Sequence, residues 1–236
     1  MGRALAIGLT LAFVVSFAAC TAKANPVARA EFDDLNGWNV YKSAGHAGQG
    51  KRTPTAVKVQ DGILNITGNE RGGTGGLSWT GHAQQYGQWD VRMRAPAGCA
   101  CYHPVVLLWG TGGGDGVNNP NGEVDIVEAF QNPARDKNEF SVHFGDGSQF
   151  VGGSTVVDMT QWHVYHVLWR ERFLTTWIDD NPPYFTTRDA SVLPKGAVDV
   201  AVQLDWFPDE PRTGGPTASM QVDYVTQAPP PSGGPS

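Results

Sequence analysis

The chain has 236 residues, of which 40% are hydrophobic and 17% are charged, and its formal net charge at pH 7 is −6. This acidic balance disfavours nucleic acid and sulfated polysaccharides as partners, because binding a polyanion normally requires a basic surface. A neutral glycan fits the charge better, and the eight tryptophans point weakly the same way, since indole rings stack on sugars.

Residues 1–24 have the features of an export signal. Arg3 precedes an apolar run from Ala4 to Ala19, and small residues follow, ending in Ala22-Lys23-Ala24. The run is shorter than the roughly 20 residues that span a bilayer. Two processing routes stay open, cleavage after Ala24 or lipoprotein-type processing at Cys20. We therefore expect a secreted protein or, alternatively, one whose membrane contact is a lipid anchor at Cys20.

The remaining sequence has an all-β pattern. Short apolar or alternating runs are separated by Gly, Pro, Asn and Asp, without an internal repeat or a long amphipathic helix. The runs predict strands at 55–60, 63–67, 87–94, 105–109, 123–130, 139–144, 163–170, 173–178, 198–204 and 220–225. Many short strands in about 200 residues predict one domain of two packed antiparallel sheets. We assign residues 25–227 to this domain and 228–236 to a disordered Pro/Gly/Ser tail.

The strand predicted at 123–130 carries three acids, Glu123, Asp125 and Glu128. Strict alternation would place Glu123 and Asp125 on one face and send Glu128 to the other, into the core. A β-bulge at Ile126-Val127 would bring all three acids to one surface. The opposite face would then be wholly apolar, with Val124, Ile126, Val127 and Ala129.

The acid spacing alone also fits a solvated strand face, because charged side chains mostly face water. The neighbouring runs favour a functional site. Residues 104–109 form an apolar run that ends in Trp109, and residues 140–144 alternate, with Ser141 and His143 on the polar face. If these strands pair in chain order, Trp109, the acids and His143 lie on one surface.

These segments resemble glycoside hydrolase family 16, in particular its laminarinase-like branch with the bulged Glu-x-Asp-x-x-Glu pattern. The resemblance rests on GEVDIVEAF, on the preceding LLWG and YGQWDVRMR, and on looser matches from roughly residue 30 to residue 226. It implies a jelly-roll β-sandwich with a concave substrate cleft. The sequence departs from the family at Gly110, where the family often has Pro, and at Cys99-Ala100-Cys101.

The resemblance also implies retaining chemistry, in which one carboxylate attacks the sugar and a second carboxyl donates a proton. Glu123 matches the nucleophile, Glu128 the acid/base, Asp125 a residue that tunes Glu123, and His143 an assisting residue. We expect negative neighbours to raise the pKa of Glu128, and donors to keep Glu123 ionised. Five steps along a flat strand span about 16 Å, so the sheet must bend to bring the two glutamates together.

Three further residues are candidates for substrate binding. Trp109 and Trp206 could stack on sugars, although Trp109 could equally belong to the core. Arg92 matches a family arginine, but it alternates with apolar residues and could equally face solvent.

No cofactor is required, and we predict no catalytic metal. A structural calcium at Asp33, Asp34 or Asp223 is conceivable from the resemblance. Cys99 and Cys101, with His103 nearby, make a poor zinc signature, and a disulfide between them would close a tight ring.

We expect a monomeric, secreted, retaining endo-glycosidase that acts on a neutral β-glucan, most simply β-1,3-glucan of the laminarin type. The alternatives are a β-agarase-like enzyme, a transglycosylating family member, and a carbohydrate-binding jelly roll without turnover. The acid triplet disfavours the last of these, because crowded carboxylates cost stability unless catalysis uses them.

Overall fold

The computed structural model describes residues 28–113 and 118–233. The predicted export signal at 1–24, including Cys20, lies outside these residues. Within the described ranges, no helix is long and apolar enough to cross a membrane.

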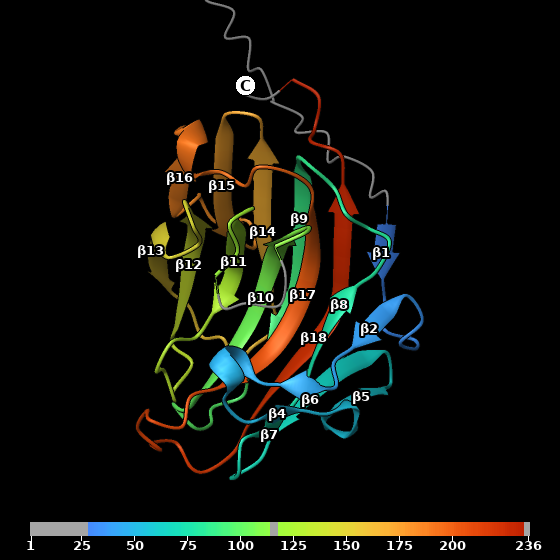
Figure 1. The fold of residues 1–236 in the computed structure, drawn as a ribbon, viewed down its shortest axis with the longest axis vertical. Coiled ribbons are helices and arrows are strands. Elements are labelled where there is room, and N and C mark those ends of the chain that lie inside the picture. Colours follow the sequence, from blue (N-terminus) through green and yellow to red (C-terminus); the bar gives the residue numbers. More distant parts are fainter. Residues whose placement is uncertain (1–27, 114–117, 234–236) are drawn as a thin grey trace, which may run out of the picture.

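The described residues form eighteen strands and three short 3-10 helices (Figure 1). The strands are β1 (Ala28–Ala30), β2 (Trp38–Val40), β3 (Ser43–Ala44), β4 (Lys51–Arg52), β5 (Val57–Gln60), β6 (Ile63–Gly68), β7 (Gly73–Thr74), β8 (Gly76–Trp79), β9 (Gly87–Arg94), β10 (Tyr102–Gly110), β11 (Glu123–Glu128), β12 (Lys137–Phe144), β13 (Gln149–Val156), β14 (His163–Arg170), β15 (Phe173–Ile178), β16 (Phe185–Thr187), β17 (Val198–Trp206) and β18 (Ala218–Ala228). The 3-10 helices are η1 (His46–Gly48), η2 (Pro54–Ala56) and η3 (Ala190–Val192).

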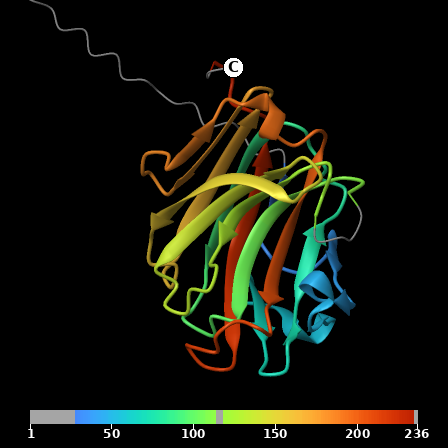
Figure 2. The same cartoon turned by 60° about the vertical axis from the view of Figure 1, so that its left-hand side comes forward.

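Two large antiparallel sheets form a sandwich, as the sequence predicts. The outer sheet has the order β16-β15-β14-β9-β18-β6-β5, with β1 paired to β18, and the cleft sheet has the order β13-β12-β11-β10-β17-β8-β2. A small third sheet, β3-β4-β7, lies at one end of the molecule. Strands of the cleft sheet bend along their length, most visibly β12 and β13, drawn in yellow in Figure 2. The cleft sheet is therefore curved and not flat.

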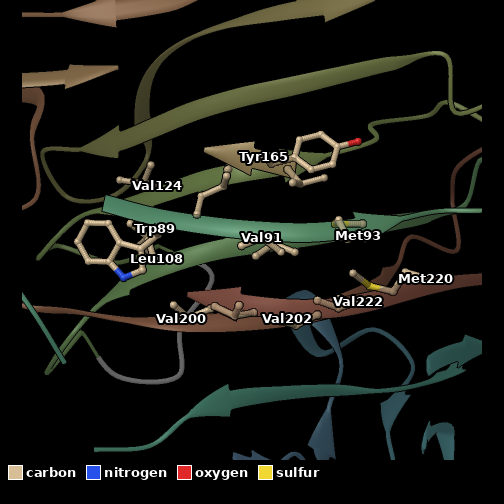
Figure 3. Packing of buried hydrophobic residues seen from close by; sticks show 14 of the residues in the cluster. Trp89, Val91, Met93, Leu108, Val124, Tyr165, Val200, Val202, Met220 and Val222 are labelled. Carbon is tan, nitrogen blue, oxygen red and sulfur yellow. The ribbon is translucent and has the colours of Figure 1, made fainter. Parts of the chain in front are cut away.

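The core fills the space between the two sheets. Strand β9 has a strictly alternating burial pattern, and its apolar residues Trp89, Val91 and Met93 are fully buried. Figure 3 shows them beside Leu108 of β10 and Val124 of β11, which come from the facing sheet. One face of each sheet thus packs in the core. The other face of the cleft sheet points away from the core, where a functional site can form.

The observed strands agree well with the predicted ones in the middle of the chain. Strands β9, β14 and β15 have the predicted bounds, whereas β10 begins at Tyr102 instead of Val105. Strand β13 was not predicted, because Gly152-Gly153 interrupts its pattern. Strand β18 extends to Ala228, which we had assigned to the tail. The tail as a disordered segment stays a prediction.

Cys99 and Cys101 are joined by a disulfide and are fully buried. The chain turns sharply there, and the backbone N–H of Tyr102 donates to the carbonyl of Cys99 at 3.1 Å. This turn leads directly into β10, so the disulfide lies at the start of a strand that forms the centre of the cleft sheet.

Candidate active site

The predicted bulge is present in β11. Against β10, Val127 is opposite Val106 and Asp125 is opposite Leu107, so Ile126 is the extra residue. Against β12, Asp125 is opposite Ser141 and Glu128 is opposite Glu139, so Ile126 and Val127 together face the single residue Phe140. The apolar residues of the strand, Val124, Ile126, Val127 and Ala129, are all fully buried in the core. Glu123, Asp125 and Glu128 therefore lie on the opposite, cleft-side face.

The side chain of Asn138 on β12 binds the backbone at the bulge. Its Oδ1 accepts a hydrogen bond from the N–H of Glu128 at 3.2 Å, and its Nδ2 donates to the carbonyl of Ile126 at 3.2 Å. Nδ2 also lies 2.9 Å from the hydroxyl of Tyr184. A bulge leaves backbone groups without ladder partners, and buried groups of this kind need other ones. Asn138 supplies them and fixes the direction of the Glu128 side chain.

Asp125 is bound by two residues of β12. The hydroxyl of Ser141 donates to Oδ2 of Asp125 at 2.6 Å, and Nε2 of His143 lies 3.1 Å from the same oxygen. Burial by itself would lower the pKa of His143, but the hydrogen bond and charge of Asp125 outweigh this, so the pKa is raised. His143 thus contacts Asp125 and not Glu128.

The pKa values of the two glutamates, Glu123 and Glu128, are both raised above the ordinary value of a glutamate. Burial raises the pKa of Glu123 to about 10, with further contributions from the charge and hydrogen bond of Asp125 and from the charge of Glu128. Burial also raises the pKa of Glu128, against the lowering effect of a hydrogen bond to His103. The donors that we expected around Glu123 are not seen in the described part of the chain, where its hydrogen-bond partner is Asp125. The raised pKa values of Glu123 and Glu128 favour a proton on this pair of carboxyls at neutral pH.

His103 was missed as a site residue. Its imidazole is fully buried, with Nδ1 lying 3.3 Å from Oε1 of Glu128. From the sequence, His103 is considered only as a neighbour of Cys99 and Cys101, because the strand predicted there begins at Val105. Period two, extended back from Trp109 through Leu107 and Val105, would have placed His103 on the cleft face.

A cleft of about 1060 Å³ adjoins Glu123. Its floor comes from β10, β17, β8 and β2, and one wall comes from the segment 41–48, which includes η1. The polar lining includes Asn39, Ser78, Asp199, Gln203 and Asp205. Asp205 is held by Arg52 at 2.6 Å. Polar side chains in such a groove can form hydrogen bonds with sugar hydroxyls, and its apolar surfaces can contact the sugar rings, so the groove suits a carbohydrate chain.

Trp109 lines this cleft and lies opposite Glu123 in the register of β10 and β11. It packs on a small apolar cluster on the cleft side of the sheet, formed by Val105, Leu107 and Ala201. The indole therefore borders the acids with a firm apolar support beneath it.

The structure places the other two proposed substrate-binding residues away from the cleft. Trp206 shares its face of β17 with Val202 and Leu204, and it packs against the core near Gly72. Its neighbour Phe207 is nearer the acids and stacks on His103, with ring centroids 4.1 Å apart. Because side chains alternate along a strand, Trp206 cannot share the face of the acids.

Arg92 belongs to β9 in the outer sheet and forms an ion pair with Asp223. It also lies over the ring of Trp162, at 4.9 Å. These partners are on the solvent-facing side of the outer sheet, so Arg92 is a surface strand residue and not part of the cleft.

Among the described residues, no group of three or more His, Cys, Asp or Glu side chains could hold a metal ion. Asp223, one of the three calcium candidates, is paired with Arg92, and Asp34 accepts a hydrogen bond from the backbone N–H of Asn36 at 2.7 Å. Calcium binding stays an untested prediction.

Two packed antiparallel sheets with a row of acids on a bulged strand of the cleft sheet define a class, the β-sandwich glycoside hydrolases. The family model for glycosyl hydrolases family 16 matches residues 47–226. The chain belongs to this family.

Solved structures with the same fold include glucanases of different linkage preference. The catalytic domain LamAcat from Zobellia galactanivorans is 18% identical, with a TM-score of 0.72 over 86% of this chain and 97% of that one. An endo-1,3-β-glucanase (laminarinase) catalytic domain from Thermotoga petrophila is 19% identical, with a TM-score of 0.72 over 86% and 97%. A β-1,3-1,4-glucanase (lichenase) from a mouse hindgut metagenome is 17% identical, with a TM-score of 0.72 over 85% and 98%. No curated protein sequence matches this chain.

Proposed function

We propose that this chain is a secreted endo-β-glucanase that hydrolyses β-1,3-linked glucan with retention of anomeric configuration. The observation that carries the proposal is the bulge in β11, which places Glu123, Asp125 and Glu128 on one face beside the cleft. Glycosidic bonds are cut by two carboxyl groups on either side of the anomeric carbon, and the retaining route requires them close together.

In the proposed reaction, Glu123 and Glu128 share one proton, which lies on Glu128 when substrate is bound. The Glu123 carboxylate then attacks the anomeric carbon while the Glu128 carboxyl protonates the departing glycosidic oxygen. The resulting glycosyl-enzyme is attacked by water, and the Glu128 carboxylate removes a proton from that water. Asp125, held by Ser141 and His143, carries a negative charge beside Glu123. This charge stabilises the positive charge that develops on the sugar ring in the transition state.

The β-1,3 preference is supported by a similar structure named as a laminarinase and by the similar LamA_E269S, which was solved in complex with laminaritriose and laminaritetraose. Another similar structure is a non-specific endo-β-1,3(4)-glucanase, so mixed-linkage glucan is the nearest competing substrate. Secretion is supported by the signal-like residues 1–24 and by the Cys99–Cys101 disulfide, since disulfides persist in oxidising compartments.

The test is the release of reducing ends from laminarin, lichenan and agarose by purified residues 25–236 and by its Glu123→Gln variant. We expect release from laminarin that the variant loses by more than about 1,000-fold. Greater release from lichenan or agarose would refute the β-1,3 preference. Longer oligosaccharide products would instead indicate transglycosylation, and an inactive wild type would refute the proposal.

A further inference from the structure

A buried histidine connects the Glu128 carboxyl to a second carboxyl that comes from a distant loop. Nδ1 of His103 lies 3.3 Å from Oε1 of Glu128, and Nε2 lies 2.8 Å from Oε2 of Glu210. His103 and Glu210 are 107 residues apart in the chain. The three side chains thus form a continuous hydrogen-bonded chain from the cleft floor to the loop after β17.

The imidazole is held in place on every side. Its ring stacks on Phe207 at 4.1 Å and lies 4.8 Å from Phe130, between centroids. The backbone N–H of Gln131 also points at Nε2, at 3.2 Å. A ring packed in this way cannot rotate without breaking these contacts, so it presents Nδ1 to Glu128 in one orientation.

Other charged groups near His103 already have partners. Asp205, opposite His103 in the register of β10 and β17, is held by Arg52 at 2.6 Å. The guanidinium of Arg135 donates to the carbonyls of Tyr102 at 2.9 Å and Cys99 at 3.2 Å. Within the described ranges, the carboxyls in hydrogen-bond contact with His103 are therefore those of Glu128 and Glu210.

We propose that His103 and Glu210 are positioning residues for Glu128: Glu210 fixes the imidazole, and the imidazole orients the carboxyl that donates the proton to the leaving group. This inference rests on the proposed function. A carboxyl that must first donate and later accept a proton gains from a ring nitrogen that can accept or donate in turn. A histidine oriented by a carboxylate is a recurring way of fixing such a partner.

The first test compares two substrates in the Glu210→Gln and His103→Gln variants. The natural glucan has a poor leaving group that needs a proton, whereas a dinitrophenyl β-glucoside of a short glucan leaves without one. We expect kcat on the glucan to fall by about 10-fold or more with little change in KM. The kcat/KM on the aryl glycoside reports only formation of the glycosyl-enzyme, which needs no proton donor for this leaving group, and it should fall by less than about 3-fold. Equal losses on both substrates, or no loss on either, would overturn the inference.

The matched control is His166→Gln. His166 lies in the outer sheet and pairs with Asp90 at 2.7 Å, so it reproduces a histidine–carboxyl pair away from the cleft. We expect both activities to be unchanged in it. Since His103 is fully buried and its replacement could prevent folding, the Glu210→Gln variant decides the outcome if that happens.

A second measurement does not depend on activity. In ¹⁵N-labelled protein, the ring signals of His103 should shift in both Glu128→Gln and Glu210→Gln, because each variant removes one carboxyl partner. Signals that respond to neither variant would overturn the inference. If the wild type cleaves no glycan while the ring signals respond to both variants, the proposed function is wrong, whereas the hydrogen bonds that join Glu128, His103 and Glu210 are confirmed.

Discussion

The side-chain amide of Asn138 bridges the bulge that precedes Glu128, accepting from the N–H of Glu128 and donating to the carbonyl of Ile126, each at 3.2 Å. Because the bulge decides which face Glu128 occupies, this buried amide connects the stability of one strand to the geometry of the whole acid row.

Replacing Asn138 with Ala should therefore affect both stability and activity. Two buried backbone groups lose their partner, which we expect to lower the free energy of unfolding by about 2 kcal/mol. The kcat on laminarin should fall as well, because Glu128 is no longer held. Urea unfolding and initial rates measure the two effects. The control is Asn65→Ala in the outer sheet, where the amide donates to the carbonyl of Ile63; it should cost stability without lowering kcat.

The Glu123→Gln variant should be more stable than the wild type at neutral and alkaline pH. The pKa of Glu123 is raised to about 10, so the folded state resists an ionisation that the unfolded chain undergoes near its ordinary value of 4.5. Below pH 4.5 the raised pKa has no effect on the free energy of unfolding of the wild type. As the pH rises from 4.5 toward 10, the free energy of unfolding falls progressively, because the unfolded chain loses the proton that the folded state keeps. We expect a gain of at least about 1 kcal/mol at pH 7, since each pKa unit corresponds to about 1.4 kcal/mol. Melting curves at pH 4, 7 and 9 test this, and a gain that is constant with pH would contradict it.

The Asp125→Asn variant should shift the whole pH–rate profile of laminarin hydrolysis toward acid. The charge of Asp125 raises the pKa of both Glu123 and Glu128, so removing the charge lowers both. Both the acidic and the basic limb then move to lower pH, with a reduced maximum. A profile that moves toward alkaline pH would show that Asp125 does not act through its charge.

The sequence was informative where side-chain alternation alone decides the structure. The regular patterns of β9, β14 and β15 fix their bounds, and the three acids among apolar neighbours are enough to infer the bulge in β11. Parity along β17 could also have excluded Trp206 from the cleft, because it shares a face with Leu204.

Other features depend on contacts between distant segments. Arg92 was misplaced because alternation shows that it faces outward but not which sheet carries it. The pairing of His103 with Glu210 joins a strand to a loop 107 residues away, and no local pattern encodes it. The acid row and its neighbours Ser141 and His143 were therefore predictable from sequence, whereas the contacts of Glu128 with His103 and Asn138 were not.

The two tryptophans should separate binding from stability. Trp109→Ala removes a ring that lines the cleft and should raise KM for laminarin by about 10-fold, which corresponds to about 1.4 kcal/mol of stacking on the substrate. Trp206→Ala removes a ring packed against the core and should lower the free energy of unfolding by about 2 to 4 kcal/mol, with KM unchanged. The reverse assignment of the two effects would show that Trp206 contacts the substrate.

The most direct test of the retaining mechanism is to trap the covalent intermediate. A 2-deoxy-2-fluoro glycoside of a laminari-oligosaccharide with a dinitrophenyl leaving group slows hydrolysis of the glycosyl-enzyme, and mass spectrometry of the digested protein locates the adduct. We predict a single adduct on Glu123. An adduct on Glu128 or another residue, or turnover that yields the inverted anomer without an adduct, would contradict the assignment of Glu123 as the nucleophile.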